Sequence, residues 1–124
     1  MNEPTPTILV VEDEDQVRML LLEILKREGY KSLAASDAGK ALDILDQADI
    51  DLVLLDLHMP GPADGEDLLF LLRDRGDEVP IIIVSGWVDD EATTNHPDCV
   101  HAVLKKPIEV ARFVETIKQV LALS

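Results

Sequence analysis

The stretch LVLLDLHMP, residues 52–60, decides the fold because an unbroken apolar run ends on a carboxylate. Its first four residues are Leu or Val, and Asp56 follows them directly. A strand that is apolar at every position, rather than at alternate positions, is typical of a parallel sheet covered on both faces. Asp56 would then stand at the carboxyl end of a buried strand, where the sites of parallel α/β sheets collect.

Four other segments predict the remaining strands of this sheet. Three are rich in branched apolar residues: ILVV at 8–11, IIIV at 81–84 and the weaker VHAVL at 100–104. The fourth, YKSLAAS at 30–36, is less apolar and is expected at an edge of the sheet. Together with 52–55 these segments make five strands.

Helical periodicity follows the first two strands. The segment at 16–29 is expected to bury one face and to end at Gly29. The segment at 37–48 is expected to begin with a cap from Ser36 or Asp37. The residues predicted to face the core are Val17, Leu20, Leu21, Ile24 and Leu25 in the first helix and Ala38, Ala41, Leu42 and Leu45 in the second.

Three further segments complete the helical pattern. Helical spacing returns at 65–76 and at 108–123. The segment 88–98 offers only Ala92 as an inward apolar residue, so we expect a short or mobile helix there. Because strand and helix alternate throughout, the sequence predicts a doubly wound, five-stranded parallel α/β sheet with helices on both faces, a flavodoxin-like fold.

Length and composition bound the class of protein. The 124 residues suit one domain, 47% of them are hydrophobic, and the formal net charge is -14. Direct binding to nucleic acid is not expected, because phosphate contacts need clustered Lys and Arg. Cys99 is the only cysteine, and neither a secretion leader nor a membrane-spanning apolar run occurs. We therefore expect a cytoplasmic protein, with residues 1–6 as a disordered lead-in and 7–124 as the domain.

Polar residues stand at the carboxyl ends of four predicted strands. Glu12 and Asp13 follow the first strand, and Asp56 follows the third. Ser85 follows the fourth strand and Lys106 the fifth. Parallel strands end at one edge of the sheet, so these side chains are expected around one pocket. Neighbouring carboxylates repel by about 1 to 4 kcal/mol for each pair at ~4 Å, and a hard divalent cation, Mg2+, is predicted to relieve this repulsion.

A cation beside Asp56 would keep its carboxylate charged and nucleophilic. Carboxylate attack on phosphorus forms an aspartyl phosphate. Ser85 could then donate a hydrogen bond to one phosphoryl oxygen, and the Lys106 ammonium could neutralise another. The sequence therefore predicts that Asp56 is a phosphoacceptor.

Four motifs in this order resemble the receiver domain of two-component response regulators, from Thr7 to about Leu123. They are the acid pair in VVED, the acceptor in LLDLHMPG, the hydroxyl in VSG and the lysine in LKKP. Each motif alone is weak. All four at the predicted strand ends make a specific signal for a receiver-like fold.

The resemblance implies a role for each matched residue. Asp56 would take a phosphoryl group from a sensor histidine kinase or a phosphotransfer protein, and Ser85 and Lys106 would bind that group. The implied Mg2+ ligands are Glu12, Asp13, Asp56 and the backbone carbonyl of His58, with Glu12 acting through water. The bond between Lys106 and Pro107 would be cis, as in the family.

The resemblance also implies a conformational output. Phosphorylation would shift the face formed by the fourth helix, the fifth strand and the fifth helix, and a downstream effector that the sequence does not identify would bind there. The same face is a candidate surface for a homodimer. No output domain is expected after the last helix. Whether the chain is a stand-alone receiver or a piece of a larger regulator or hybrid kinase stays open.

The chain departs from the family pattern at three places. Val103 stands where many members carry a Tyr or Phe that moves inward on phosphorylation, and His101 is expected to be a surface residue rather than its substitute. The loop after the acceptor has one extra residue and is expected to bulge at Pro62. The third departure is the thin helix expected within 88–98.

Simpler interpretations remain beside the phosphoacceptor hypothesis. Asp13 or Asp15 could cap the first helix, and Asp56 could be a strand-end carboxylate that pairs with Lys106. The alternative function is a pseudo-receiver, an interaction module without a phosphate cycle. An enzyme is not expected beyond self-phosphorylation and self-dephosphorylation. Phosphatases that work through an aspartyl phosphate have a second acid where this chain has His58.

Overall fold

The computed structural model describes residues 5–56, 65–76, 78–86 and 100–123, apart from the side chains of residues 65–67, 85 and 123. Some predicted features therefore lie outside the described residues. They are most of the lead-in at 1–6, the backbone carbonyl of His58, the loop at Pro62 and the segment 88–98. Elsewhere the predicted strands and helices can be compared with the structure directly.

Five strands form one parallel sheet in the order β2-β1-β3-β4-β5. The strands are β1 (Thr7–Val11), β2 (Lys31–Ala35), β3 (Leu52–Leu55), β4 (Ile81–Ser85) and β5 (Val100–Lys105). The described helices are α1 (Asp15–Arg27), α2 (Ala38–Gln47), α3 (Gly65–Asp74) and α5 (Val110–Leu123). β2 lies at an edge of the sheet, as its lower apolar content predicts. The predicted doubly wound, flavodoxin-like fold is confirmed.

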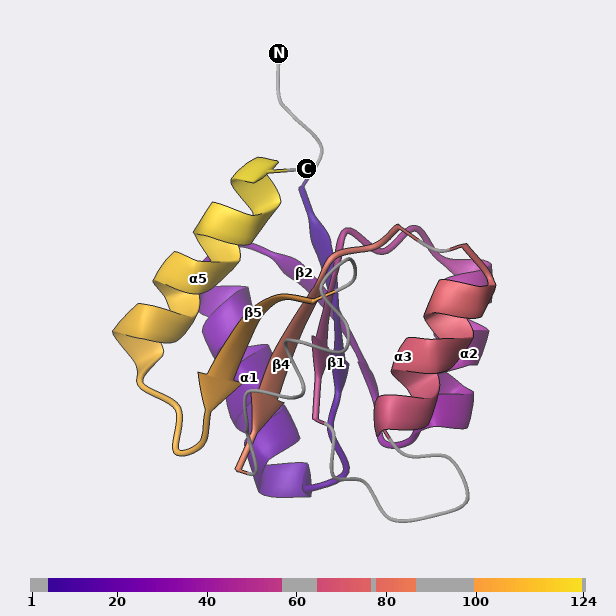
Figure 1. The fold of residues 1–124 in the computed structure, drawn as a ribbon. Coiled ribbons are helices and arrows are strands. Elements are labelled where there is room, and N and C mark those ends of the chain that lie inside the picture. Colours follow the sequence, from indigo (N-terminus) through magenta and orange to yellow (C-terminus); the bar gives the residue numbers. More distant parts are fainter. Residues whose placement is uncertain (1–4, 57–64, 77, 87–99, 124) are drawn as a thin grey trace.

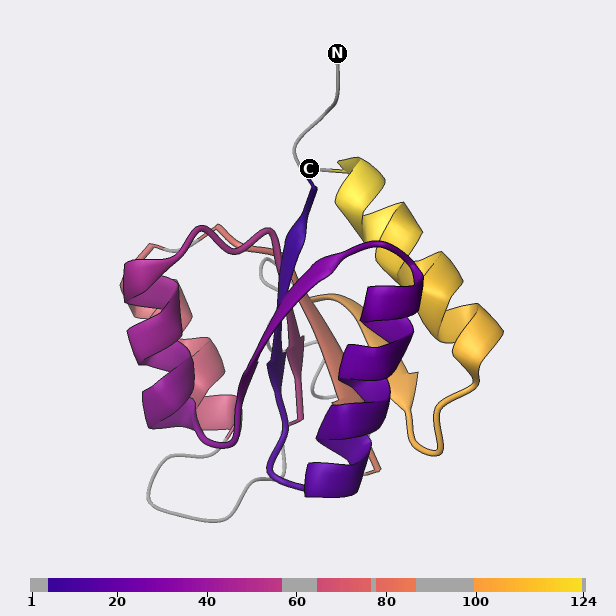
Figure 2. The same cartoon turned by 180° about the vertical axis from the view of Figure 1, so that it is seen from behind.

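The helices cover the sheet in two layers. α1 and α5 lie on one face, and α2 and α3 lie on the other (Figure 1), and the view from behind shows the same arrangement (Figure 2). Alternate residues of β1 serve the two layers: Ile8 and Val10 belong to the core with α1 and α5, whereas Leu9 and Val11 belong to the core with α2 and α3. This double burial explains why the central strands are apolar at every position.

The predicted ends of α1 and α2 are present in the structure. Gly29 has φ 86°, and the N–H groups of Gly29 and Tyr30 donate to the carbonyls of Lys26 and Leu25. These two bonds form a Schellman motif, in which glycine is favoured because the backbone is left-handed. At the start of α2, the Asp37 carboxylate accepts a hydrogen bond of 2.8 Å from the Lys40 N–H, so Asp37 rather than Ser36 is the cap.

One prediction about the core face of α1 is wrong. Leu21, Ile24 and Leu25 are buried, but the Leu20 side chain is 49% exposed. Residues advance by about 100° around a helix, and this places Leu20 roughly 100° from Leu21. Leu20 therefore lies beyond the arc that faces the sheet.

Strand pairing decides which residues meet at the carboxyl edge of the sheet. β1 and β3 are neighbours, and Val11 is paired with Leu55. Glu12 and Asp56, each one residue further along, therefore lie side by side. Among the described residues, no helix is long and apolar enough to cross a membrane.

Candidate functional site

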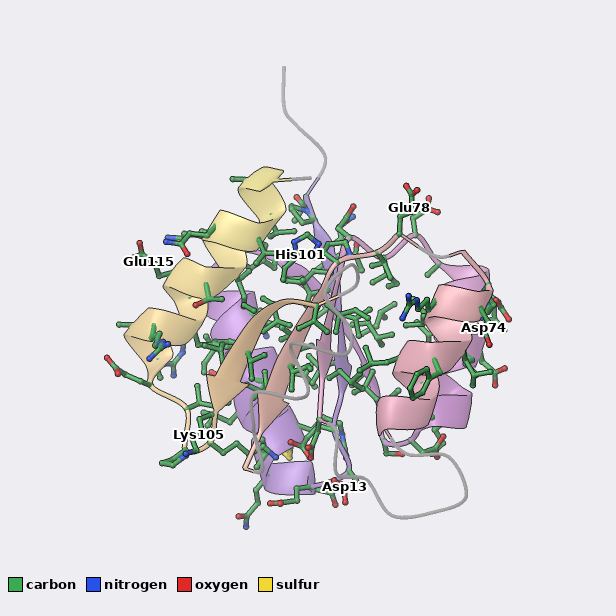
Figure 3. All side chains as sticks on the ribbon, viewed as in Figure 1. Asp13, Asp74, Glu78, His101, Lys105 and Glu115 are labelled. Atoms are coloured by element: carbon green, nitrogen blue, oxygen red, sulfur yellow. The ribbon has the colours of Figure 1, made fainter. Side chains whose placement is uncertain are left out.

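Three carboxylates converge where β1 and β3 end. One oxygen from each of Glu12, Asp13 and Asp56 lies within 4.8 Å of the others. Glu12 is 1% exposed and Asp56 is 4% exposed, so two of the acids are buried. Figure 3 labels Asp13 at the end of the molecule where α1 begins, and Lys105, at the end of β5, lies toward the same end. The predicted gathering of strand-end acids is thus a feature of the structure.

Backbone hydrogen bonds fix the two buried acids in the sheet. The N–H of Asp56 donates to the Val11 carbonyl at 3.0 Å, and the N–H of Glu12 donates to the Ala35 carbonyl at 3.0 Å. The Glu12 carboxylate also accepts a hydrogen bond of 3.1 Å from the Glu14 N–H through Oε2. These bonds extend the sheet pairing by one residue past each strand and hold the carboxylates in place.

Lys106 is the cation nearest to this cluster among the described residues. Its Nζ lies 2.5 Å from Glu12 Oε1, as an ion pair whose geometry is not that of a hydrogen bond. The same ammonium donates a hydrogen bond of 3.3 Å to Asp56 Oδ2. One lysine from the end of the fifth strand therefore contacts acids from the ends of the first and third strands.

Burial dominates the electrostatics of Glu12. Its pKa is raised from 4.5 to about 7, chiefly by loss of solvation on burial and also by the nearby Asp56 charge. The contact with Lys106 and the hydrogen bond from Glu14 act in the opposite direction. For Lys106, burial lowers the pKa, but its contacts with Glu12 and Asp56 outweigh burial and raise the pKa above the ordinary value. A positive charge in this pocket therefore stabilises the ionised form of Glu12.

The cluster fits a hard divalent cation. All three groups offer oxygen, the ligand that Mg2+ prefers. The Asp13 Oδ1 atom is buried and has no hydrogen-bond partner among the described residues. A buried, unpartnered carboxylate oxygen is costly, and a cation at this position would satisfy it. Glu12, Asp13 and Asp56 can therefore hold such an ion.

The structure describes some of the other residues that the sequence analysis singled out. Ser85 ends β4, next to β3, but its side chain lies outside the described part of the chain, as does His58. His101 is exposed and lies toward the opposite end of the molecule from Asp13 (Figure 3), so it is a surface histidine as predicted. Val103 is partly buried against the core with α2 and α3. The peptide bond from Lys106 to Pro107 is cis.

The idea that Asp13 or Asp15 caps α1 is wrong. The N-cap residue is Glu14, and it makes no side-chain capping bond. Asp15 instead forms an ion pair with Arg18. Sequence reasoning did not single out Arg18, whose guanidinium binds the carbonyl oxygens of Glu12 and Asp13. The available signal was the spacing of Arg18 three residues after Asp15, which permits a pair across one helical turn.

Known proteins similar to this chain include members of one family of signalling domains. The family model described as the response regulator receiver domain matches residues 8–118. The polar-differentiation response regulator DivK from Brucella ovis is 30% identical over 121 residues, which cover 94% of this chain and 97% of DivK. The sensor kinase CckA from Brucella abortus is 36% identical over 118 residues, which cover 93% of this chain but only 12% of that protein.

Solved structures show the same fold. The response regulator protein TrrA from Thermotoga maritima, solved in complex with Mg(2+)-BeF, matches with a TM-score of 0.82 and 28% sequence identity. The match covers 94% of this chain and 99% of TrrA. The similarity therefore extends over nearly the whole of both chains.

Proposed function

The chain belongs to the response regulator receiver domain family, and from this premise we propose that Asp56 accepts a phosphoryl group in a two-component signalling pathway. The observation that carries this proposal is the placement of Asp56. Its buried carboxylate lies at the end of β3, beside the Glu12 and Asp13 oxygens and 3.3 Å from the Lys106 ammonium. A carboxylate in these surroundings is held close to groups that can balance added negative charge.

In the proposed reaction, a carboxylate oxygen of Asp56 attacks the phosphorus of a phosphohistidine on a kinase or phosphotransfer protein. A P–O bond forms, the P–N bond breaks, and the histidine nitrogen keeps the electron pair. Glu12, Asp13, Asp56 and the His58 carbonyl would hold Mg2+. When bound, this ion would neutralise part of the phosphoryl charge. The chain thus acts as a signalling module and, beyond this self-modification, not as an enzyme.

Two side chains would bind the new phosphoryl group. The Lys106 ammonium already contacts Asp56 and can stay with it while exchanging Glu12 for a phosphoryl oxygen. Ser85 ends β4, the strand beside β3, and we propose that its hydroxyl donates to another oxygen. Movement of Ser85 and its loop would alter the face that includes β5 and α5, where an effector or a second copy would bind. The cytoplasm is the proposed compartment, since kinases of this pathway phosphorylate their receivers there.

The pseudo-receiver remains the alternative to this proposal. Its one sequence argument is Val103, which replaces the aromatic residue that many receivers carry. The acids and the lysine that a phosphate cycle needs are present and lie together in the structure. The receiver with a working phosphate cycle is therefore the better supported of the two.

The test is intact mass spectrometry after incubation with Mg2+ and acetyl phosphate. The wild type is expected to gain one phosphoryl group, because Asp56 lies in a pocket that stabilises the product. Asp56→Asn should gain none, and Asp49→Asn, which changes an exposed aspartate, should behave like the wild type. Removal of Mg2+ should abolish the gain.

A wild type that gains no mass from acetyl phosphate or from a phosphorylated histidine kinase would overturn the proposal in favour of the pseudo-receiver. A gain that persists in Asp56→Asn would move the phosphoacceptor to another residue.

A further inference from the structure

Arg18 folds back over the start of its own helix to reach the loop that carries two of the acids. Its Nη1 donates to the Glu12 carbonyl at 3.0 Å and more weakly to the Asp13 carbonyl at 3.4 Å. Its Nη2 is paired with the Asp15 carboxylate. The Arg18 side chain is only 20% exposed, so these bonds are partly shielded from water.

This placement works against the preferences of a helix. The amino end of α1 carries a partial positive charge, and a cation drawn toward it is unfavourable. The N-cap Glu14 also leaves the first turn without a side-chain capping bond. Asp15 offsets the charge of the guanidinium. Arg18 pairs with Asp15 across one turn of α1, but its two other bonds reach the carbonyl oxygens of residues that precede the helix.

Arg18 matters more for the position of Asp13 than for that of Glu12. Glu12 is also held by its N–H bond to Ala35 and by the Glu14 N–H at its carboxylate. Asp13 accepts at its carbonyl from Arg18, while its buried Oδ1 has no hydrogen-bond partner among the described residues. Rotation of the peptide groups at 12–14 would carry Asp13 Oδ1 out of the cluster, and the Arg18 bonds oppose that rotation.

We propose that Arg18 is a positioning residue that orients the Glu12 and Asp13 carboxylates toward a divalent cation. The proposal rests on the function proposed above, since it deepens the role of the same site. Arg18 acts through the peptide groups that carry the ligands, because it binds the carbonyl oxygens of Glu12 and Asp13. Loss of a residue that orients metal ligands weakens metal affinity because the ligands then sample other directions.

The test compares three variants by Mg2+ titration, followed by calorimetry. Arg18→Met keeps the apolar stem and loses the bonds, and should raise the Mg2+ dissociation constant about tenfold. Arg18→Lys can reach one carbonyl but cannot bridge both carbonyls and Asp15, and should give about a threefold rise. Arg27→Met, a control that changes an exposed arginine of the same helix, should stay within about twofold.

Amide hydrogen exchange separates positioning from general stability. In Arg18→Met the Glu14 amide, which is bonded to Glu12 Oε2, should exchange about tenfold faster while Ile24 in the core of α1 is unchanged. The Mg2+ concentration that gives half-maximal phosphorylation of Arg18→Met should rise about tenfold, in step with the dissociation constant.

An unchanged Mg2+ dissociation constant in Arg18→Met would overturn the proposal, as would faster exchange spread evenly over α1. Wild-type protein that binds Mg2+ but takes no phosphoryl group would overturn the proposed function alone, because the Arg18 comparison needs only the ion. Wild-type protein that binds no Mg2+ would overturn both.

Discussion

Glu12 combines near-complete burial with a formal negative charge. Its pKa is raised to about 7, chiefly by burial, from 4.5 in an exposed chain. Between these two values the folded protein binds more protons at Glu12 than the unfolded protein does. The free energy of unfolding should therefore fall as pH rises from about 4.5 to 7, by about 3 kcal/mol at most. Urea unfolding at a series of pH values without Mg2+ measures this slope.

Two comparisons isolate the contribution of Glu12. Glu12→Gln should flatten the slope and be more stable than the wild type at pH 8, since the buried charge is gone. Glu115→Gln changes an exposed acid and should leave the slope as it is. Saturating Mg2+ should also reduce the fall, because a cation favours the charged form. A wild type that becomes more stable between pH 5 and pH 7 without Mg2+ would contradict this account.

Lys106 contacts two of the carboxylates that a divalent cation would bind, so the two cations compete. Lys106→Met should bind Mg2+ more tightly by about 1 kcal/mol, roughly fivefold in the dissociation constant, because one repelling charge is removed. The same variant should be less stable than the wild type without Mg2+. Titration by calorimetry and urea unfolding check the two parts.

The neighbouring lysine gives a matched control for this experiment. Lys105 is exposed, and Lys105→Met should change neither Mg2+ affinity nor stability by a comparable amount. Weaker Mg2+ binding in Lys106→Met would show that Lys106 supports the ion rather than competing with it.

At the scale of the elements, two glycines should respond oppositely to alanine. Gly29 has φ 86° in the Schellman motif after α1, and no atom lies within 4 Å of an added Cβ. Gly29→Ala should therefore cost about 1 to 2 kcal/mol from backbone strain alone. Gly39 lies inside α2, where an added Cβ would meet the Asp37 carboxylate at an ordinary 3.4 Å. Gly39→Ala should stabilise the protein by up to about 1 kcal/mol through helix propensity.

Urea unfolding of the two alanine variants measures both effects against the wild type. Equal stability changes in the two variants would contradict the separation of backbone strain from helix propensity.

The strands could be predicted well from the sequence, and the side-chain directions only in part. Burial on both faces makes 52–55 apolar throughout, so the pattern marks the strand almost to the residue. The face of α1 is harder, because Leu20 satisfies helical spacing yet lies beyond the arc that the sheet covers. Local spacing says which residues share a side of a helix. How far around the helix the sheet covers these residues depends on the packing of the folded protein.

The candidate site also has features that the sequence pattern predicts and features that depend on packing. The gathering of Glu12, Asp13 and Asp56 could be predicted because it needs only parallel strands that end at one edge. The closer approach of Lys106 to Glu12 than to Asp56 could not, since it depends on side-chain conformations in the folded pocket. The role of Arg18 was missed because spacing indicates only its pair with Asp15, whereas its bonds to backbone carbonyls leave no trace in the residue types of a motif.

At the scale of the whole molecule, sheet order makes a compact site from distant parts of the chain. β1 and β3 lie next to each other, and Lys106 directly follows β5. α1 and α5 form one layer and α2 and α3 the other, with the sheet between them (Figures 1 and 2). Glu12, Asp13 and Asp56 follow β1 and β3 of this sheet.

The acids and the lysine of the pocket lie far apart in the sequence, so they are synthesised at different times. Glu12 is synthesised first, Asp56 44 residues later and Lys106 a further 50 residues later. A nascent chain that has delivered the acids but not β5 holds buried carboxylates without their internal counter-charge, which penalises premature closure of the sheet. Charge balance in the pocket is thus reached only after β5 and Lys106 have been synthesised.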